Sequence, residues 1–139
     1  MRAIEQGGLK LAIYVSGKEV QKGLNFYTSD SDFIQVGTWV YESGKELLPH
    51  IHNKGVRREI DRTQELIHVI QGRLRARLYS EDEKEVASLE MTSGDTLVLL
   101  GGGHGYEVLE DGTKVLEVKN GPYVGLELDR RRINPVSQR

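Results

Sequence analysis

The stretch Gly44-Lys-Glu-Leu-Leu-Pro-His50-Ile51-His52 carries most of the fold prediction, because it sets two histidines two positions apart. On a β-strand, residues i and i+2 project from the same face, so both imidazoles would point toward one spot. Imidazole pairs of this kind form half of many transition-metal sites. The alternative is that both histidines are ordinary surface or packing residues.

The sequence around this stretch has the pattern of an all-β protein. Glycine- and Asx-rich clusters recur at short intervals, and segments of strand length lie between them. Residues 33–41 and 73–79 alternate with period two, and in the second segment apolar residues oppose three arginines. Asp111-Gly112 predicts a hairpin between residues 107–109 and 114–118. Since no segment keeps a helical period, we expect a β-sandwich or barrel.

Size and composition point to one globular domain. The 139 residues predict a single domain 1–139, with a core of about 33–128, an N-terminal edge strand at 8–15 and a polar C-terminal end at 130–139. The formal charge of −2 gives no general attraction to nucleic acid. Cysteine is absent, which excludes disulfides and thiolate sites and favours the cytoplasm. We expect no signal peptide and no membrane partner.

Two glycines extend the histidine pattern into a longer motif. Gly44 lies six positions before His50, and Gly72 lies seven positions after Glu65. The chain here resembles the first motif of the cupin superfamily, G-x5-H-x-H-x3-4-E-x6-G. It departs from that motif in the gap, because twelve residues separate His52 from Glu65. Glu59 lies in this gap and is a rival carboxylate, but the spacing to Gly72 favours Glu65.

A second, looser motif covers Gly94 to His104. It resembles G-x5-P-x-G-x2-H-x3-N, although Leu100 replaces the proline and Val108 stands where asparagine is expected. The resemblance covers roughly residues 34–118. It implies a small single-domain cupin with the double-stranded β-helix, or jelly-roll barrel.

The resemblance also implies a cofactor and a ligand set. One divalent transition metal (Fe, Mn, Ni, Zn or Cu) is expected, because imidazole and carboxylate suit these ions better than calcium or magnesium. The expected ligands are His50, His52, Glu65 and His104. A homodimer is the expected assembly of a protein of this class.

Other residues have predicted roles near this site. Tyr106 shares the parity of His104 and is predicted, with Glu65, to be catalytic, although it could equally fill the barrel. His68 should face the opposite way from Glu65, and Trp39 should pack in the interior. Three arginines of the long gap are candidates for binding an anionic substrate, the alternatives being a solvated loop or a dimer contact. These are Arg57, Arg58 and Arg62.

Three hypotheses of function follow, each with a small molecule as the partner. The first is a metalloenzyme that oxidises or isomerises a small anionic molecule. The second is a cupin that binds a small ligand without changing it. The third is a metal-independent nucleotide-sugar epimerase or isomerase, in which His104 acts as a base beside Tyr106.

Overall fold

Strands make up most of the regular structure, so the predicted all-β class is confirmed. The structure, a computed structural model, describes residues 1–50, 52–53, 59–121 and 124–133. Within these ranges, the helical elements are the 3-10 turn η1 (Gly17–Glu19) and the helix α1 (Leu126–Asp129), and no helix is long and apolar enough to cross a membrane. The strands are β1 (Arg2–Gln6), β2 (Leu9–Val15), β3 (Gly23–Phe26), β4 (Gly37–Val40), β5 (Glu65–Gln71), β6 (Arg73–Tyr79), β7 (Glu85–Thr92), β8 (Thr96–Leu99), β9 (Gly103–Val108) and β10 (Lys114–Lys119).

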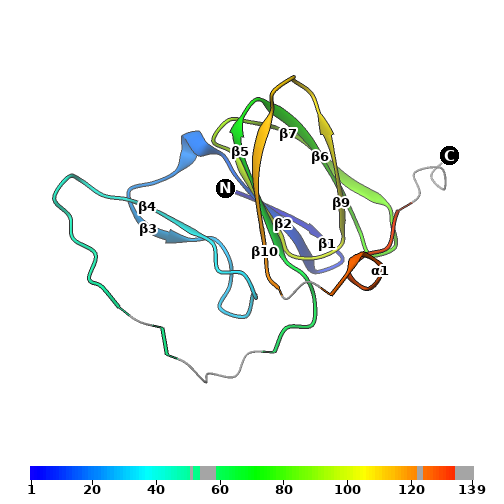
Figure 1. Ribbon diagram of the computed structural model, residues 1–139, viewed down its shortest axis with the longest axis horizontal. Helices are drawn as coiled ribbons and strands as arrows, with labels where there is room; N and C mark the ends of the chain where they lie inside the picture. The colour runs from blue at the N-terminus through cyan, green and yellow to red at the C-terminus, as the bar shows by residue number, and fades with distance from the viewer. Residues whose placement is uncertain (51, 54–58, 122–123, 134–139) are drawn as a thin grey trace.

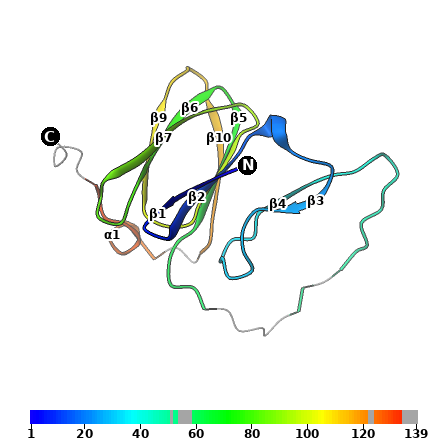
Figure 2. The same cartoon turned by 180° about the vertical axis from the view of Figure 1, so that it is seen from behind.

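Two antiparallel sheets form what we call the body. A five-stranded sheet has the order β1-β2-β8-β5-β10, and a three-stranded sheet has the order β7-β6-β9. The two sheets face each other in Figures 1 and 2, and the main apolar core lies between them. Its residues include Ile67, Val69, Leu78, Met91 and Leu97, each at most 2% exposed. Each such side chain contributes roughly 1.5–3 kcal/mol by leaving water.

Residues 73–79 behave as their alternation predicts. Leu74, Ala76 and Leu78 are buried, whereas the three arginines between them lie on the outer face of β6. There they form ion pairs with Glu90 on β7 and Glu107 on β9. This outer face is therefore exposed to solvent, and it carries arginine and glutamate side chains that pair across neighbouring strands.

The strands β3 and β4 form a separate two-stranded ribbon, which we call the arm. The chain segments at its base pack on the outer face of the five-stranded sheet in a second apolar cluster. Val36 anchors this base: its backbone N–H donates to Thr28 Oγ1, and its carbonyl accepts from Tyr27. Beyond the base, the arm projects from the body, and residues 41–64 return from it as a long connection without strands in its described part (Figures 1 and 2).

Several finer predictions are wrong. The strand expected at 8–15 exists as β2, but it is an interior strand because β1 covers its outer edge. The core also begins earlier than residue 33, since Ile4 and Leu11 are buried. The predicted jelly-roll barrel stays a prediction, since the strand ladders of the described residues form three separate sheets and no closed barrel is found among them.

The hairpin expected around Asp111-Gly112 is also wrong. A tight turn is present, in which the backbone N–H of Thr113 donates to the carbonyl of Glu110. However, β9 pairs with β6 and β10 pairs with β5, so this turn joins the two sheets of the body. Each strand finds a longer partner in a different sheet, and the local turn signal does not reveal this choice.

Candidate functional site

Glu65 is a carboxylate at the start of β5 with only 7% of its surface exposed. Its neighbours on the same face, Ile67 and Val69, are buried as their parity predicts. Lys119 lies directly opposite Glu65 at the end of β10, so the two side chains share the inner face of the sheet. This register sets a carboxylate and an ammonium group side by side at one end of the body.

His104 and Tyr106 reach the same place from the other sheet. Both lie on β9, opposite Leu78 and Ala76 of β6, so their side chains turn toward the interior. The preceding Gly102 has a φ of +67°, and a Cβ at this position would collide with the carbonyl oxygen of Tyr79. Glycine is therefore required where the chain passes the end of β6 and begins β9.

Two of the predicted residues, His104 and Tyr106, converge on the carboxylate of the third, Glu65. His104 Nε2 lies 3.6 Å from Glu65 Oε2, and the Tyr106 hydroxyl donates to Glu65 Oε1 over 3.4 Å. The Lys119 ammonium lies 3.8 Å from Glu65 Oε2 and 2.5 Å from Glu117 Oε1. We call Glu65, His104, Tyr106, Glu117 and Lys119 the inner-face cluster.

Burial is the main cause of the pKa shifts of three members of this cluster, Glu65, His104 and Tyr106. Burial is the main cause that raises the pKa of Glu65, the negative Glu117 raises it further, and Lys119 opposes both. Burial also lowers the pKa of His104 and raises the pKa of the Tyr106 hydroxyl. The site therefore favours a neutral imidazole and a protonated phenol beside a carboxyl group that holds its proton more tightly than usual. These groups can exchange protons with a ligand or supply lone pairs to a cation.

The remaining expected ligands, His50 and His52, lie elsewhere. Both are exposed on the connection between the arm and β5, outside any strand, so the strand expected at the His-x-His pair is not observed there. Their rings contact each other edge to face, with centroids 4.9 Å apart. Glu59, the rival carboxylate, is likewise exposed on this connection. The other described histidine, His68, is bonded to Thr96 Oγ1 on the outer face of the sheet, as its parity predicts.

A transition metal fits this arrangement only in part. Two donors bound at ~2.1 Å to one tetrahedral ion lie about 3.4 Å apart. The observed 3.6 Å between His104 Nε2 and Glu65 Oε2 is close to that spacing. However, no group of three His, Asp or Glu side chains in the described part of the chain is arranged to hold a metal ion. The donors thus form two pairs, one in the inner-face cluster and one on the connection.

Of the predicted substrate arginines, Arg62 is the one that the structure describes, and it does not join the inner-face cluster. Arg57 and Arg58 lie outside the described residues. Arg62 is paired with Asp61, with Nε 3.0 Å from Oδ1. The pairing neutralises the charge that would attract an anion, so Arg62 is a weaker anion binder than its sequence context suggests.

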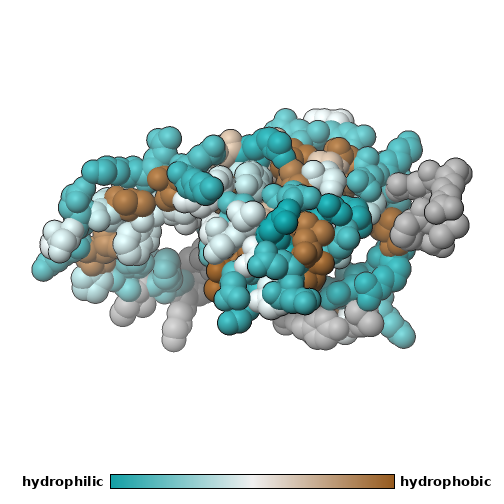
Figure 3. Space-filling view, turned by 90° about the horizontal axis from the view of Figure 1, so that it is seen from above, coloured by the Kyte–Doolittle hydropathy of each residue, from teal (hydrophilic) through white to brown (hydrophobic). Residues whose placement is uncertain are grey.

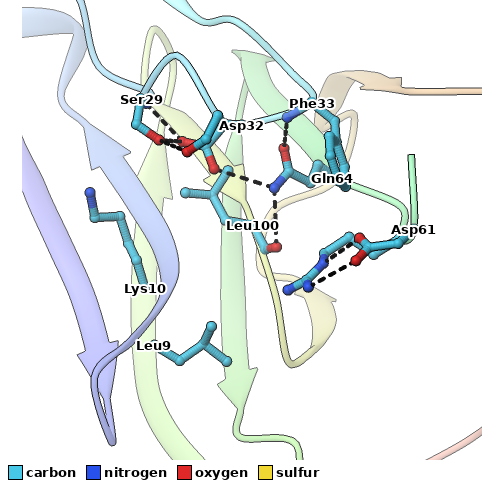
Figure 4. Close-up of a pocket in the computed structure, with 10 residues that line it drawn as sticks. Leu9, Lys10, Ser29, Asp32, Phe33, Asp61, Gln64 and Leu100 are labelled. Atoms are coloured by element: carbon cyan, nitrogen blue, oxygen red, sulfur yellow. Dashed lines mark hydrogen bonds and ion pairs between the residues drawn. The ribbon is translucent and has the colours of Figure 1, made fainter. Parts of the chain in front are cut away.

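Arg62 lines a small cavity of about 230 Å³ on another side of β5 (Figure 4). Gln64 forms one wall, where its Oε1 accepts from the backbone N–H of Phe33 and its Nε2 donates to the carbonyl of Leu100. Lys10 and Arg62 contribute positive charge, while Asp32 and Asp61 balance it. The cavity is smaller than typical ligand sites, and its lining favours neither sign of charge.

Sequence reasoning missed Glu117 and Lys119. Their signal was the alternation of residues 114–118, in which Val115 and Glu117 share a parity with Lys119. The expected hairpin drew attention to pairing with residues 107–109. The pairing with β5 is what brings Lys119 opposite Glu65.

Comparison with models of known protein families, with curated proteins and with solved structures gave no match. The function must therefore be argued from the residues of the site and from their geometry.

Proposed function

We propose that this protein is a cupin-type metalloprotein that binds one divalent transition metal and oxidises or isomerises a small anionic molecule. The ligands suggested by the sequence motif are His50, His52, Glu65 and His104, of which only Glu65 and His104 lie together in the described structure. The observation that carries the proposal is the convergence of His104 and Tyr106 on Glu65 from two different sheets. Two facing antiparallel sheets joined by a turn between β9 and β10 also suit a jelly roll.

Each group of the inner-face cluster has a role in this proposal. Glu65 and His104 offer one carboxylate oxygen and one imidazole nitrogen at a spacing that suits a shared ion. His50 and His52 are the second donor pair, and the His-x-His spacing supports their inclusion. When bound, the metal would polarise a substrate oxygen as a Lewis acid. Tyr106, whose phenol stays protonated, would donate its hydrogen bond to the substrate in place of its long bond to Glu65.

The test is the metal content of the purified full-length chain, measured by elemental analysis. We expect about one transition metal per chain in wild type. The double variant His50→Ala/His52→Ala and the variant Glu65→Gln should each lose most of it. His68→Ala is the matched control and should keep it, because His68 faces the outer side of the sheet. Metal-free wild type that also rejects added Zn²⁺, Mn²⁺ and Fe²⁺ would refute the proposal.

A metal-independent isomerase or epimerase is the second candidate. It is favoured by the direct contact of Glu65 with both Tyr106 and His104, which makes an acid–base site without His50 or His52. A panel of nucleotide sugars in deuterated water with a strong chelator separates the two candidates. Deuterium exchange into a substrate that needs Tyr106 and survives chelation would favour the isomerase. Ligand binding without turnover under any of these conditions would instead favour the non-catalytic cupin.

A further inference from the structure

The arm has one apolar face that the described structure leaves largely uncovered, apart from the Lys45 ammonium, which lies 5.6 Å from the centroid of the Tyr41 ring. In the β3–β4 register, Leu24 lies opposite Trp39, and Phe26 lies opposite Gly37. Residues two apart share a face, so Tyr41 extends this face beyond the end of β4, where its ring stacks on Trp39 with centroids 6.0 Å apart. The exposed fractions are 56% for Leu24, 63% for Phe26, 60% for Trp39 and 37% for Tyr41. We call these four residues the arm face.

The opposite side of the ribbon is polar. Asn25 lies opposite Thr38 in the ladder, and its amide donates to the carbonyls of Gln21 and Gly23. The Thr38 hydroxyl bonds to the Tyr27 hydroxyl over 2.6 Å. The ribbon thus has one side with hydrogen-bonded polar groups, which also carries the 40% exposed Val40, and one side that is apolar throughout. A two-stranded ribbon is marginally stable by itself, so such a design needs a partner for its apolar side.

The body carries a second uncovered apolar surface, at the edge of its five-stranded sheet. Leu116 and Val118 of β10 pair with His68 and Leu66 of β5, so they lie on the outer face, as does Ile70. Their exposed fractions are 50%, 44% and 53%. Because β10 ends the strand order, its other side has no ladder partner in the described part of the chain. We call Ile70, Leu116 and Val118 the β10 strip.

The β10 strip is continuous with the apolar layer at the base of the arm. Leu66, opposite Val118, packs against the same outer-face cluster that anchors the base of the arm. The β10 strip therefore continues an apolar layer that the base of the arm already covers in part. Beyond this layer, Figure 3 shows apolar side chains on the surface of the projecting part at the left.

We propose that the arm face of one copy of this chain packs on the β10 strip of a second copy, and that the reciprocal contact closes a two-fold dimer. One chain carries both surfaces, so a two-fold axis matches each arm face to a strip, and every contact occurs twice. A buried aromatic side chain covers ~150–250 Å². At about 60% exposure, Phe26 and Trp39 alone therefore offer roughly 200–300 Å² per copy.

That area is only part of what a stable interface needs, so the other five apolar side chains of the two surfaces must supply the rest. A stable interface buries about 800 Å² per partner. Each copy would contribute an arm face and a strip, and together these surfaces hold seven large apolar side chains that now face water. Exposed apolar patches of several hundred Å² are rare on monomers and mark interaction surfaces.

The first test is the mass of the full-length chain in solution, measured by sedimentation across micromolar concentrations. We expect a dimer whose dissociation constant rises at least about tenfold in Trp39→Ser and in Leu116→Ser, since buried aromatic anchors dominate interfaces. Leu128→Ser is the matched control, because Leu128 is 83% exposed in α1 and belongs to neither surface. A monomeric wild type, or a dimer that all three variants leave unchanged, overturns the proposal.

The second test uses the absence of cysteine from the chain. Trp39→Cys and Leu116→Cys are made separately, mixed and oxidised, so a disulfide between residues 39 and 116 can form only between two copies. We expect this mixed disulfide to accumulate as a covalent dimer. If instead only the double variant cross-links, and does so within a monomer, the arm covers its own strip and the dimer proposal is wrong. Neither test depends on a metal ion. The dimer proposal can therefore be refuted without refuting the proposed function, and the reverse is also true.

Discussion

The body and the arm are both built from antiparallel strands that carry large apolar residues, yet they bury them very differently. Leu97 and Met91 of the body are fully buried, whereas Leu24 and Trp39 of the arm are more than half exposed. The difference is not strand propensity, since both regions pair in register. It lies in layering: the body stacks two sheets face to face, and the arm is one ribbon without a second layer.

The comparison teaches that strand pairing and burial are separate steps in a β protein. Ladder hydrogen bonds largely replace bonds to water, so they add little net free energy by themselves. Apolar burial adds most of the stability, and it requires an opposing surface. The body finds that surface within the chain. The arm is proposed to find it in a second copy.

The largest expected effect comes from a cavity in the body. Leu97→Ala should lower the free energy of unfolding by about 2–5 kcal/mol, because Leu97 is fully buried between the sheets. Leu24→Ala is the matched change on the arm and should cost less than about 1 kcal/mol in the monomer. Urea unfolding of both variants under dilute, monomeric conditions measures the difference. Equal losses of unfolding free energy in the two variants would contradict the proposed difference between body and arm.

The second-largest loss of unfolding free energy should come from a backbone clash at Gly102. Gly102→Ala combines a positive φ with a collision against the Tyr79 carbonyl, and should cost on the order of 3 kcal/mol. Gly44→Ala near the arm shares a positive φ of +87°, but its Cβ would meet nothing within 4 Å, so only about 1 kcal/mol is expected. The two melting curves separate steric collision from backbone strain. If Gly102→Ala were the milder variant, the proposed reason for the glycine turn before His104 would be wrong.

A smaller loss should follow from a buried hydrogen-bond hub in the body. The Asp95 carboxylate is buried and accepts from the Tyr14 hydroxyl at 3.0 Å, from Gly17 N–H at 3.2 Å and from Thr92 N–H at 2.9 Å. Asp95→Asn replaces one acceptor oxygen with a donor and should cost about 1–3 kcal/mol. Asp111→Asn changes an exposed turn residue and should stay within about 0.5 kcal/mol. Chemical denaturation of both gives the comparison.

The smallest expected effect is a pH slope from Tyr14. Burial and the bond to Asp95 raise the pKa of Tyr14 above 10.0 in the folded state. Above pH 10 the unfolded chain therefore loses this proton first, so the folded state holds more protons and its stability falls as pH rises. Below pH 10 both states keep the proton, and this contribution is constant. Unfolding at pH 9 to 11 should show a shallower slope for Tyr14→Phe than for wild type, with the exposed arm variant Tyr41→Phe as the control.

Local sequence rules worked where one strand face meets one buried layer. They found β6 through the alternation of residues 73–79, and they placed Tyr106 on the same strand face as His104 by parity. The expectation that Glu65 lies near both came from the cupin resemblance. They failed for Trp39, which was expected to pack but is 60% exposed, because alternation says that a face is apolar without saying what covers it. They also failed for the turn at Asp111-Gly112, since a tight turn fixes the chain reversal and not the partner strand.

The sequence by itself determined the all-β class, the inner and outer faces of the body strands, and the candidate residues of the site, because these depend on period two, glycine positions and side-chain chemistry. The tertiary structure decided which strands pair across the two sheets, and so brought Lys119 to Glu65 and left His50 and His52 on the connection. Such long-range pairing depends on how whole faces fit together. That fit is a property of the assembled layers, and no short stretch of sequence contains it.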